Sequence, residues 1–342
     1  MRNILFNTNE LRSDRLTGLG QVSSAIFHNL KNFKLKSCSL KRYKFESNFY
    51  FNIRRIAWMQ FIVPRIIDQL DYDLFFSPIT DAPISNKVRS IVMVHDLISI
   101  RFSYSYLVKT FYRAYIPAVL RSSELIITNS NCTTNELIKT YKLNPEKIHT
   151  MKLGYDSQNI FSEEVNRENF YLILGSHYYH KNIPNILKAI NLLNKKNLKF
   201  IFAGQFDSVL TPSYINMADD LQISKLCVWE GWVDIDRKRD LLNRCKGLIM
   251  PSLWEGFGIP ALEALACGTP VIGSIRGATP EVLGSLGILV DPLNINEIAD
   301  AISQIENNSK IIHKINIEGP KRAAMFDWSE SVKKLEKVIS NI

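Results

Sequence analysis

The stretch that decides the fold is PSLWEGFGIPALEALACGTPVIG, residues 251–273. The apolar run GLIM before it, residues 247–250, is a predicted strand, and Pro260 is expected to open a helix. Proline is well placed at a helix start, because the N–H that it lacks would be unpaired there anyway. Glycines precede this helix, so the backbone amides of residues 258–261 would face whatever lies in front of it. Such a glycine-led helix N-terminus favours binding of a phosphate group.

Two carboxylates accompany the start of this helix. Glu255 lies just ahead of the glycines, and we expect Glu263 in the first turn of the helix, so that both flank one pocket. Carboxylates accept hydrogen bonds from sugar or ribose hydroxyls, which would complement amides that hold a phosphate. The competing structural interpretation makes Glu263 a partner of the helix dipole and Glu255 a surface acid.

The rest of the chain alternates short apolar runs with longer amphipathic segments, which is typical of βα units and parallel sheets. Strands are predicted at residues 4–7, 73–77, 90–95, 125–128, 170–175, 198–204, 227–230, 247–250 and 270–273. Helices are predicted at residues 21–30, 57–69, 133–141, 184–194, 235–244, 260–267 and 295–307. A chain of 342 residues exceeds what one core usually organises. We therefore expect two doubly wound domains, joined within the polar segment 153–169.

The composition is that of a folded globular chain, with 46% hydrophobic and 22% charged residues. No apolar run approaches the roughly 20 residues that cross a bilayer, and the first residues are too polar for a signal-peptide core. We therefore expect a cytoplasmic protein. Five cysteines are scattered along the chain without a CxxC pair, which favours buried reduced thiols over a disulfide framework or a zinc site.

The net charge of +9 is concentrated in residues 31–65, where nine basic residues minus the single acid Glu46 give +8. Eight aromatic residues are interleaved with these charges. Three interpretations are open. The segment is a solvated basic face over core aromatics, or it docks to an anionic membrane surface or polyanionic lipid carrier. The third, nucleic-acid binding, has no recognisable motif to support it.

Several shorter motifs have an ordinary explanation that competes with a functional one. His95 ends a predicted strand, where parallel sheets place ligands, although a lone histidine is more often structural. Asp96 beside it either orients the imidazole or forms a turn. The glycines of residues 18–20 lie too far from the first strand, and lack the third glycine, for a dinucleotide fingerprint. The D-x-D patterns at 71–73 and 234–236 match a metal-binding spacing, but they fit a strand start and a helix N-terminal turn.

Residues 251–273 resemble the E-x7-E signature of family 4 of the retaining GT-B glycosyltransferases, with Glu255 and Glu263 at the acidic positions. Further segments resemble this family in order and spacing, and together they extend over nearly the whole chain. They are TGLGQVSSAIFHNL at 17–30, VHDL at 94–97, GSHYYHKN at 175–182, IRGATPEVLGSLGILVDP at 275–292 and FDWSESVKKLEKVI at 326–339.

The resemblance implies an α/β GT-B fold, in which two doubly wound Rossmann-like domains face each other across a cleft. Residues 1–155 would form the acceptor-side domain and residues 156–327 the domain that binds the nucleotide-sugar donor. The last helix, 328–342, would pack back onto the first domain.

The resemblance also implies the site residues. Catalytic roles fall to His95, Lys181 and Glu255. Contacts to the donor fall to Gly20, Gly175, His180, Val233, Gly258, Ile259 and Glu263. Lys181 would stabilise the negative charge of the departing diphosphate.

His180 stands where the family pattern has arginine, and histidine is often uncharged near neutral pH, whereas arginine is not. Lys181 and the helix N-terminus, or another cation such as Arg276, would then carry more of the charge stabilisation.

The activity implied is transfer of a hexose, with retention and without a metal ion or cofactor, to a polyprenyl-diphosphate-linked or oligosaccharide acceptor in bacterial surface polysaccharide (O-antigen) synthesis. GDP-mannose is the favoured donor, because the HDL and Lys-Asn forms resemble the mannosyltransferase branch, and UDP-sugars remain open. The protein would act in the cytoplasm, at the inner face of the membrane, without nucleic acid. Two alternatives are a nucleotide-sugar epimerase of the same fold and a non-catalytic sugar-nucleotide binder.

Overall fold

The computed structural model describes residues 2–12, 18–85, 87–102 and 106–342. Thr17, the first residue of the glycine segment singled out above, lies outside these ranges. The chain divides into two compact units, Met1–Leu153 with Trp328–Ile342 and Gly154–Asp327. The sequence analysis placed the two divisions after residues 155 and 327, so the first lies two residues later than here.

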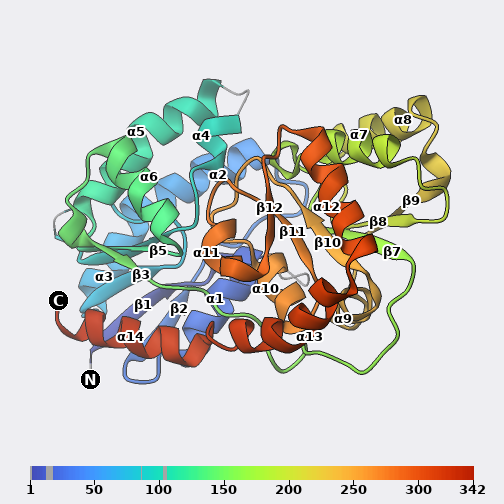
Figure 1. The fold of residues 1–342 in the computed structure, drawn as a ribbon. Coiled ribbons are helices and arrows are strands. Elements are labelled where there is room, and N and C mark those ends of the chain that lie inside the picture. Colours follow the sequence, from blue (N-terminus) through green and yellow to red (C-terminus); the bar gives the residue numbers. More distant parts are fainter. Residues whose placement is uncertain (1, 13–17, 86, 103–105) are drawn as a thin grey trace. The chain divides into compact units, whose positions relative to one another are not determined.

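The first unit is built on a six-stranded parallel sheet with the order β2-β1-β3-β4-β5-β6 (Figure 1). Its strands are β1 (Asn3–Asn7), β2 (Lys34–Cys38), β3 (Leu74–Ser77), β4 (Ser90–Val94), β5 (Leu125–Thr128) and β6 (Ile148–Thr150). Strands β3, β4 and β5 are buried throughout, as expected for parallel strands with helices on both faces. Since β2 and β3 lie on opposite sides of β1, the winding of the sheet reverses between β1 and β3.

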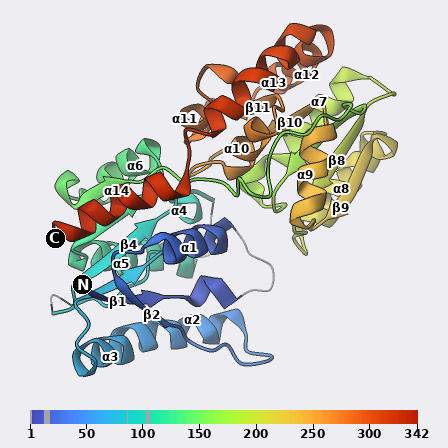
Figure 2. The ribbon, with the colours of Figure 1, turned by 90° about the horizontal axis from the view of Figure 1, so that it is seen from below.

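Helices cover both faces of this sheet. They are η1 (Asn9–Arg12), α1 (Gly18–Asn29), α2 (Asn48–Ala57), η2 (Trp58–Ile62), α3 (Val63–Gln69), α4 (Ile98–Phe102), α5 (Tyr106–Ser122), α6 (Asn131–Tyr141), η3 (Pro145–Lys147) and α14 (Trp328–Ser340). The last helix, α14, packs against α1 (Figure 2). The buried carboxylate of Glu336 fixes it there by accepting hydrogen bonds from the backbone N–H and the side-chain amide of Asn32, at 3.0 and 2.7 Å.

The second unit has another six-stranded parallel sheet, with the order β12-β11-β10-β7-β8-β9. Its strands are β7 (Phe170–Leu174), β8 (Lys199–Ala203), β9 (Cys227–Gly231), β10 (Gly247–Met250), β11 (Val271–Ser274) and β12 (Ile288–Val290). Its helices are η4 (Tyr179–Lys181), α7 (Ile183–Leu193), α8 (Leu210–Asp220), η5 (Ser224–Leu226), α9 (Ile235–Arg244), α10 (Ile259–Ala266), α11 (Thr279–Leu283), η6 (Gly284–Leu286), α12 (Ile295–Asn307) and α13 (Ser309–Ala323). The winding of this sheet reverses between β7 and β10.

The predicted fold class, two doubly wound parallel sheets, is confirmed. The strands that the sequence missed are β2, β6 and β12: β2 carries exposed lysines, and β6 and β12 have only three residues each. The five cysteines are free, as predicted, but Cys38 and Cys132 are only half-buried.

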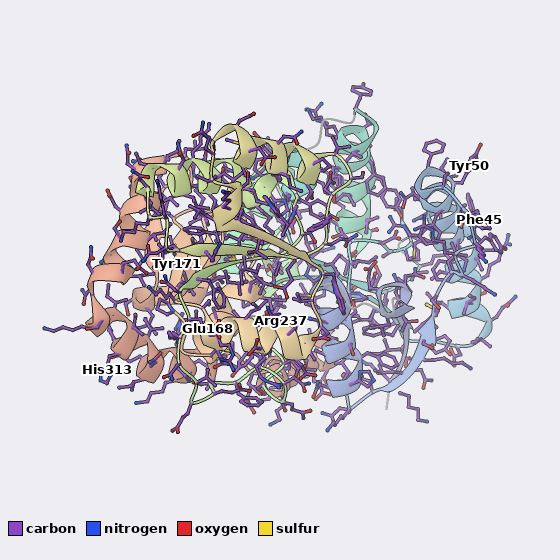
Figure 3. The ribbon with its side chains drawn as sticks, turned by 90° about the vertical axis from the view of Figure 1, so that its right-hand side faces the viewer. Phe45, Tyr50, Glu168, Tyr171, Arg237 and His313 are labelled. Atoms are coloured by element: carbon purple, nitrogen blue, oxygen red, sulfur yellow. The ribbon has the colours of Figure 1, made fainter. Side chains whose placement is uncertain are left out.

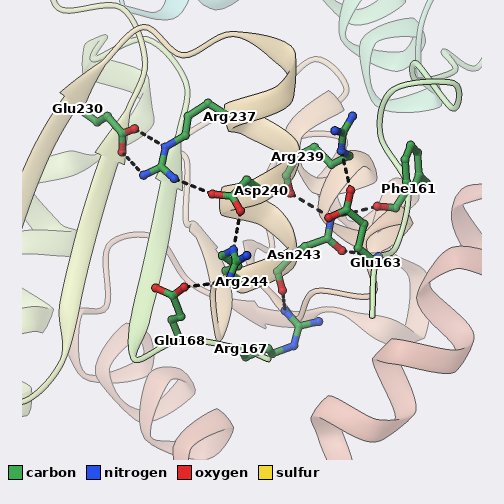
Figure 4. Close-up of polar contacts among 10 residues, drawn as sticks. All are labelled: Phe161, Glu163, Arg167, Glu168, Glu230, Arg237, Arg239, Asp240, Asn243 and Arg244. Carbon is green, nitrogen blue, oxygen red and sulfur yellow. Dashed lines mark hydrogen bonds and ion pairs between the residues drawn. The ribbon is translucent and has the colours of Figure 1, made fainter. Parts of the chain in front are cut away.

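Segment 154–169, which connects β6 to β7, is tied to helix α9 (Figure 4). Arg239 Nε lies 2.8 Å from a carboxylate oxygen of Glu163. The side chain of Asn243 accepts a hydrogen bond from the Glu163 backbone N–H at 2.8 Å and donates one to the Phe161 carbonyl at 3.1 Å. These bonds satisfy backbone groups in a segment that has no helix or strand of its own.

Arg167 anchors the end of the same segment more deeply. Its guanidinium donates to five acceptors around α9 and α13, none of them charged. They are the carbonyls of Asn243, Cys245 and Gly268, the hydroxyl of Thr269 and the side-chain oxygen of Asn316. These five acceptors come from three separate stretches of the chain, so Arg167 holds the end of α9, the turn after α10 and α13 together.

Arg167→Met should destabilise the second unit by about 3–5 kcal/mol, because it leaves several half-buried acceptors without a donor. The matched control is Arg239→Met, which removes a partly exposed ion pair and should cost about 1 kcal/mol or less. Urea unfolding followed by tryptophan fluorescence measures both. Equal losses in the two variants would show that Arg167 is no special anchor.

Candidate active site

The loops after β7 and β10 meet at the point where the winding of the second sheet reverses. Ligands of doubly wound sheets bind at the carboxyl ends of the strands at such points. The backbone N–H of Leu253 donates to the His180 carbonyl at 2.7 Å. The side-chain amide of Asn182 donates to the carbonyls of Pro251 and Pro292, at 3.0 and 2.6 Å. The two loops, with the segment after β12, therefore form one cross-linked frame.

An ion pair between Lys181 and Glu255 joins the two loops. The Lys181 Nζ lies 2.7 Å from Glu255 Oε1, and the side chains are only 16% and 9% exposed. Ser252 Oγ donates to the same carboxylate oxygen at 2.6 Å. Burial alone would raise the pKa of Glu255, but Lys181 and these hydrogen bonds outweigh it and lower the pKa. Glu255 is therefore a carboxylate at neutral pH.

Helix α10 begins as the sequence predicts. Gly258 is its N-cap residue with φ of 103°, a left-handed conformation that favours glycine, and Pro260 lies in the first turn. The amides available in front of the helix differ from those expected. The Ala261 N–H donates back to the Gly258 carbonyl at 3.0 Å. A ligand at this helix start would therefore meet the amides of Gly258 and Ile259.

Glu263 was expected in the first turn of α10, and this was wrong: it is the fifth residue of the helix and lies in the second turn. It forms an ion pair with Lys238 of α9, whose side chain is 13% exposed while that of Glu263 is 3% exposed. Burial raises the pKa of Glu263, and Lys238 opposes this shift. The two carboxylates thus each have their own lysine. The sequence analysis missed Lys238, because one lysine on a charged helix carries no local signal.

Gly277, in the loop after β11, fixes the backbone of Glu255 from the other side. It has φ of 70°, and a Cβ atom there would stand 2.6 Å from the Glu255 carbonyl oxygen and 2.7 Å from its nitrogen. The next residue, Ala278, donates its N–H to that carbonyl at 2.9 Å. Only glycine permits this close approach.

The three candidate cations near the Lys181–Glu255 pair, His180, Lys181 and Arg276, differ in their charge and in their partners. Burial, with the Lys181 charge, lowers the pKa of His180 to about 4, so its imidazole is neutral at neutral pH. Arg276, proposed as a substitute cation, is paired with Asp291 at 3.0 Å. Lys181 is therefore the buried cation that contacts Glu255 directly. Gly175 follows the last residue of β7 and lies beside Lys181, because a Cβ on it would stand 3.3 Å from Lys181 Cε.

Val233 lies between β9 and α9, and the second D-x-D pattern forms the start of α9. Asp234 caps α9 by accepting the Arg237 N–H at 2.8 Å, which confirms the helix-start interpretation. In the first pattern, Asp73 accepts the Asn3 N–H at 2.7 Å. Within residues 2–12, 18–85, 87–102 and 106–342, no group of three or more His, Cys, Asp or Glu side chains is arranged to hold a metal ion.

Two predicted site residues, His95 and Gly20, belong to the first unit. His95 follows β4, and its Nε2 lies 2.8 Å from the Pro78 carbonyl oxygen, to which it must donate. Burial lowers the pKa of His95, so the ring is neutral. Asp96 forms a turn by accepting the Ile98 N–H at 2.9 Å. Gly20 was expected in a loop, but it is buried in the first turn of α1.

The fold and the site define a class of protein, and comparisons with known proteins place the chain within it. Residues 156–322 match the family described as "Glycosyl transferases group 1", and residues 37–159 match "Glycosyltransferase Family 4". The chain belongs to the family 4 GT-B glycosyltransferases.

Several curated relatives are mannosyltransferases. The chain is 28% identical to the O-antigen chain mannosyltransferase RfbU of Salmonella typhimurium over 63% of this chain and 63% of that protein. It is 25% identical to the MMP alpha-(1->4)-mannosyltransferase of Mycolicibacterium hassiacum, over 66% of this chain and 56% of the relative. The matched region thus spans less than two thirds of the length of these relatives.

Solved structures share the fold over the whole chain. Sucrose-phosphate synthase from Thermosynechococcus elongatus has a TM-score of 0.83 at 15% identity, covering 100% of this chain and 99% of that one. The Anabaena protein HepE, in complex with UDP and glucose, has a TM-score of 0.79 at 15% identity, with 100% of both chains covered. WaaG, a glycosyltransferase involved in lipopolysaccharide biosynthesis, has a TM-score of 0.76 at 15% identity, covering 98% and 99%.

Gly277→Ala should lower the stability of the second unit by about 1–3 kcal/mol, because the new Cβ would collide with the Glu255 backbone in a strained conformation. Gly18→Ala is the matched control: no atom lies within 4 Å of a Cβ there, and alanine favours the helix. Thermal unfolding measures both. If the Gly277→Ala protein unfolds at the same temperature as the wild type, the Glu255 loop can move away from the new Cβ without a measurable loss of stability.

Proposed function

We propose that the protein is a retaining glycosyltransferase that transfers mannose from GDP-mannose to a lipid-linked or oligosaccharide acceptor during synthesis of a bacterial surface polysaccharide. The observation that carries this proposal is the buried Lys181–Glu255 pair at the start of α10. The names of the curated relatives support mannose as the sugar and O-antigen as the product class. The UDP and glucose bound to HepE keep UDP-sugars as the second candidate donor.

Lys181 suits a role at the donor diphosphate. An ammonium has three N–H donors, so Lys181 could keep its bond to Glu255 and direct the others at phosphate oxygens. The amides of Gly258 and Ile259 would add two neutral donors at the helix start. Charge accumulates on the diphosphate as the bond to the sugar breaks, and fixed donors lower that barrier most where burial weakens solvent screening.

The carboxylates suit hydroxyl recognition. Glu255, ionised beside Lys181, would accept hydrogen bonds from the donor sugar, and Glu263 would accept them from the ribose. His95 would also contact the donor sugar. Because its Nε2 donates to the Pro78 carbonyl, its Nδ1 carries no proton and would accept a hydrogen bond from a sugar hydroxyl. The loop around Val233 would lie near the nucleobase.

Retention would follow from a front-face displacement. The acceptor oxygen forms its bond to the anomeric carbon on the face from which the diphosphate departs, and a leaving-group oxygen takes the acceptor proton. This route needs no enzymic base, which agrees with the lowered pKa values of His95 and His180, because an imidazole with a low pKa is a weak proton acceptor. We propose that it needs no metal ion or cofactor.

Lys181→Met should lower kcat for donor turnover by about 100- to 1000-fold, the usual loss when a transition-state donor is removed. The matched control is Lys188→Met, which removes an exposed lysine of α7 outside the candidate site and should stay within about threefold of the wild type. Steady-state kinetics at neutral pH measure both. A loss from Lys188→Met as large as that from Lys181→Met would contradict the role of Lys181.

The test of the proposed function is donor hydrolysis and transfer, screened over GDP-mannose and UDP-hexoses with a chelator present, followed by assignment of the anomeric configuration of the product. Turnover of GDP-mannose with retained configuration supports the proposal. Inversion, or activity that the chelator abolishes, rejects it. Conversion of the donor to its epimer without an acceptor would indicate an epimerase. Glu255→Gln should lower turnover far more than nucleotide affinity, whereas a binding protein shows no turnover.

The basic and aromatic residues of 40–62, which we call the basic–aromatic surface, support a membrane role. Phe45 and Tyr50 are 95% and 69% exposed and project outward (Figure 3), which makes the core-aromatic interpretation wrong for them. Exposed aromatics beside basic groups gain from interfacial burial and from anionic surface potential. Of the helices in the described part of the chain, none combines the length and apolar character of a membrane span. We therefore propose peripheral docking to an anionic membrane.

Replacing Lys41, Arg42 and Lys44 with Glu should weaken binding to vesicles containing phosphatidylglycerol at least tenfold, because each basic group near such a surface is worth about 1 kcal/mol. The control replaces Lys310, Lys314 and Lys321 of α13 with Glu, which changes the net charge equally. Vesicle co-sedimentation at several salt concentrations measures both. If both triple variants lose binding alike, the net charge and not this surface is responsible.

A further inference from the structure

The first unit has its own winding reversal, between β1 and β3, and polar side chains gather there. Glu10 lies on η1, which follows β1, and Asp81 follows β3 by four residues. The same physical reasoning that places a ligand between β7 and β10 applies at this edge. The roles assigned above use neither residue.

Asp81 is the most deeply buried charged side chain at this edge, with 2% of its surface exposed. Arg55, from the last turn of α2, lies with its Nε 3.3 Å from Asp81 Oδ2. Both atoms are buried, yet in the described part of the chain neither has a hydrogen-bond partner of acceptable geometry. Buried ion pairs that serve structure alone are normally fully hydrogen-bonded, because desolvation is otherwise uncompensated. Arg55 Nε can therefore still donate a hydrogen bond, and Asp81 Oδ2 can still accept one.

The surroundings of Asp81 are firmly fixed. The Tyr115 hydroxyl donates to Asp81 Oδ1 at 2.8 Å. The Gln60 amide donates to the Tyr115 oxygen and to the Ala82 carbonyl, each at 3.0 Å, and its own oxygen accepts the Ile84 N–H at 2.8 Å. The loop after β3 is thus held in place from α5 and η2. The second oxygen of this pre-ordered group, Oδ2, has the Arg55 Nε at 3.3 Å but no hydrogen bond of acceptable geometry, and such a group is suited to ligand recognition.

The charges around Arg55 indicate the kind of ligand. Glu10 lies close enough for Arg55 to act on its titration, and burial raises the pKa of Glu10 while Arg55 opposes the shift. Burial raises the pKa of Asp81 as well, with Arg55 opposing the shift, so two carboxyl groups share one guanidinium, which leaves little attraction for a phosphate. They match a neutral polyol, whose hydroxyls both donate and accept. The ring of Phe111 is stacked on Tyr115 at 4.8 Å, which adds a half-buried aromatic wall suited to a sugar ring.

We propose that Asp81, Arg55 and Tyr115 form a hydroxyl-recognising subsite for the pyranose ring of the acceptor. Asp81 Oδ2 accepts a hydrogen bond from one sugar hydroxyl, and the Arg55 Nε–H donates to the oxygen of a neighbouring one. The inference rests on the proposed glycosyltransferase function and adds the acceptor class, a neutral sugar, and the residues that bind it.

The test measures transfer from the active donor to methyl α-mannoside, methyl α-galactoside and methyl β-N-acetylglucosaminide, in the wild type and in Asp81→Asn and Tyr115→Phe. We expect a rise in acceptor KM on the order of 10- to 100-fold for Asp81→Asn, the size of effect expected when a hydrogen bond to a charged group is lost. The ratio of transfer to donor hydrolysis should fall in parallel. Arg89→Met, which removes an exposed arginine–glutamate pair at the opposite edge of the same sheet, is the control and should leave both quantities unchanged.

The outcomes separate this inference from the proposed function. An unchanged acceptor KM in both variants overturns the subsite, and so does a wild type that hydrolyses the donor but glycosylates none of the three glycosides. A wild type without donor turnover rejects the proposed function itself. Circular dichroism tests whether each variant is folded. If Asp81→Asn is not, Tyr115→Phe decides the question, because it removes only a single hydroxyl.

Discussion

The Lys181–Glu255 ion pair is the interaction on which the candidate site depends. Removing two charges from water is expensive, and their attraction compensates for this only when geometry is good and the remaining polar atoms are satisfied. Here Ser252 shares the carboxylate, and the loops that carry the pair are cross-linked to each other. Breaking either half would leave a buried charge. The pair therefore holds two loops together, and Lys181 keeps N–H donors beyond the one directed at Glu255.

In both units, the polar side chains that we consider functional lie at the same kind of place in a parallel sheet. The carboxyl ends of strands meet where the winding reverses, and side chains from loops distant in sequence come together there. In the second unit these are Lys181 and Glu255, and in the first they are Glu10 and Asp81. The sheets supply rigid strands, buried on both faces, and the loops supply the polar groups. Charged residues are tolerated because each has a counter-charge within the same frame.

The fold and the start of α10 were predictable from the sequence, because short apolar runs that alternate with amphipathic segments and the glycine–proline start of α10 are local signals. Lys238 and Arg55 were not. Each is an ordinary lysine or arginine on a polar helix, and its role depends on a partner, Glu263 or Asp81, brought close only by the tertiary fold. Strand β2 was also missed. It is an edge strand with exposed lysines, so its residues were interpreted only as part of the basic segment.

Helix α2 connects the two surfaces of the first unit. Its N-terminal half carries Phe49 and Tyr50, which are 57% and 69% exposed, and its last turn carries Arg55, which reaches Asp81. The excess positive charge of the segment is partly neutralised within it, since Arg54 pairs with Glu46 at 2.8 Å and lies over the Tyr43 ring. What remains is a helix with an aromatic outer end, which follows the basic residues Lys41, Arg42 and Lys44, and with one arginine, Arg55, paired to a buried carboxyl group. The lipid-linked sugar that we propose as acceptor has the complementary form, with an anionic apolar anchor at one end and a neutral ring at the other, so this segment would orient such an acceptor from both ends.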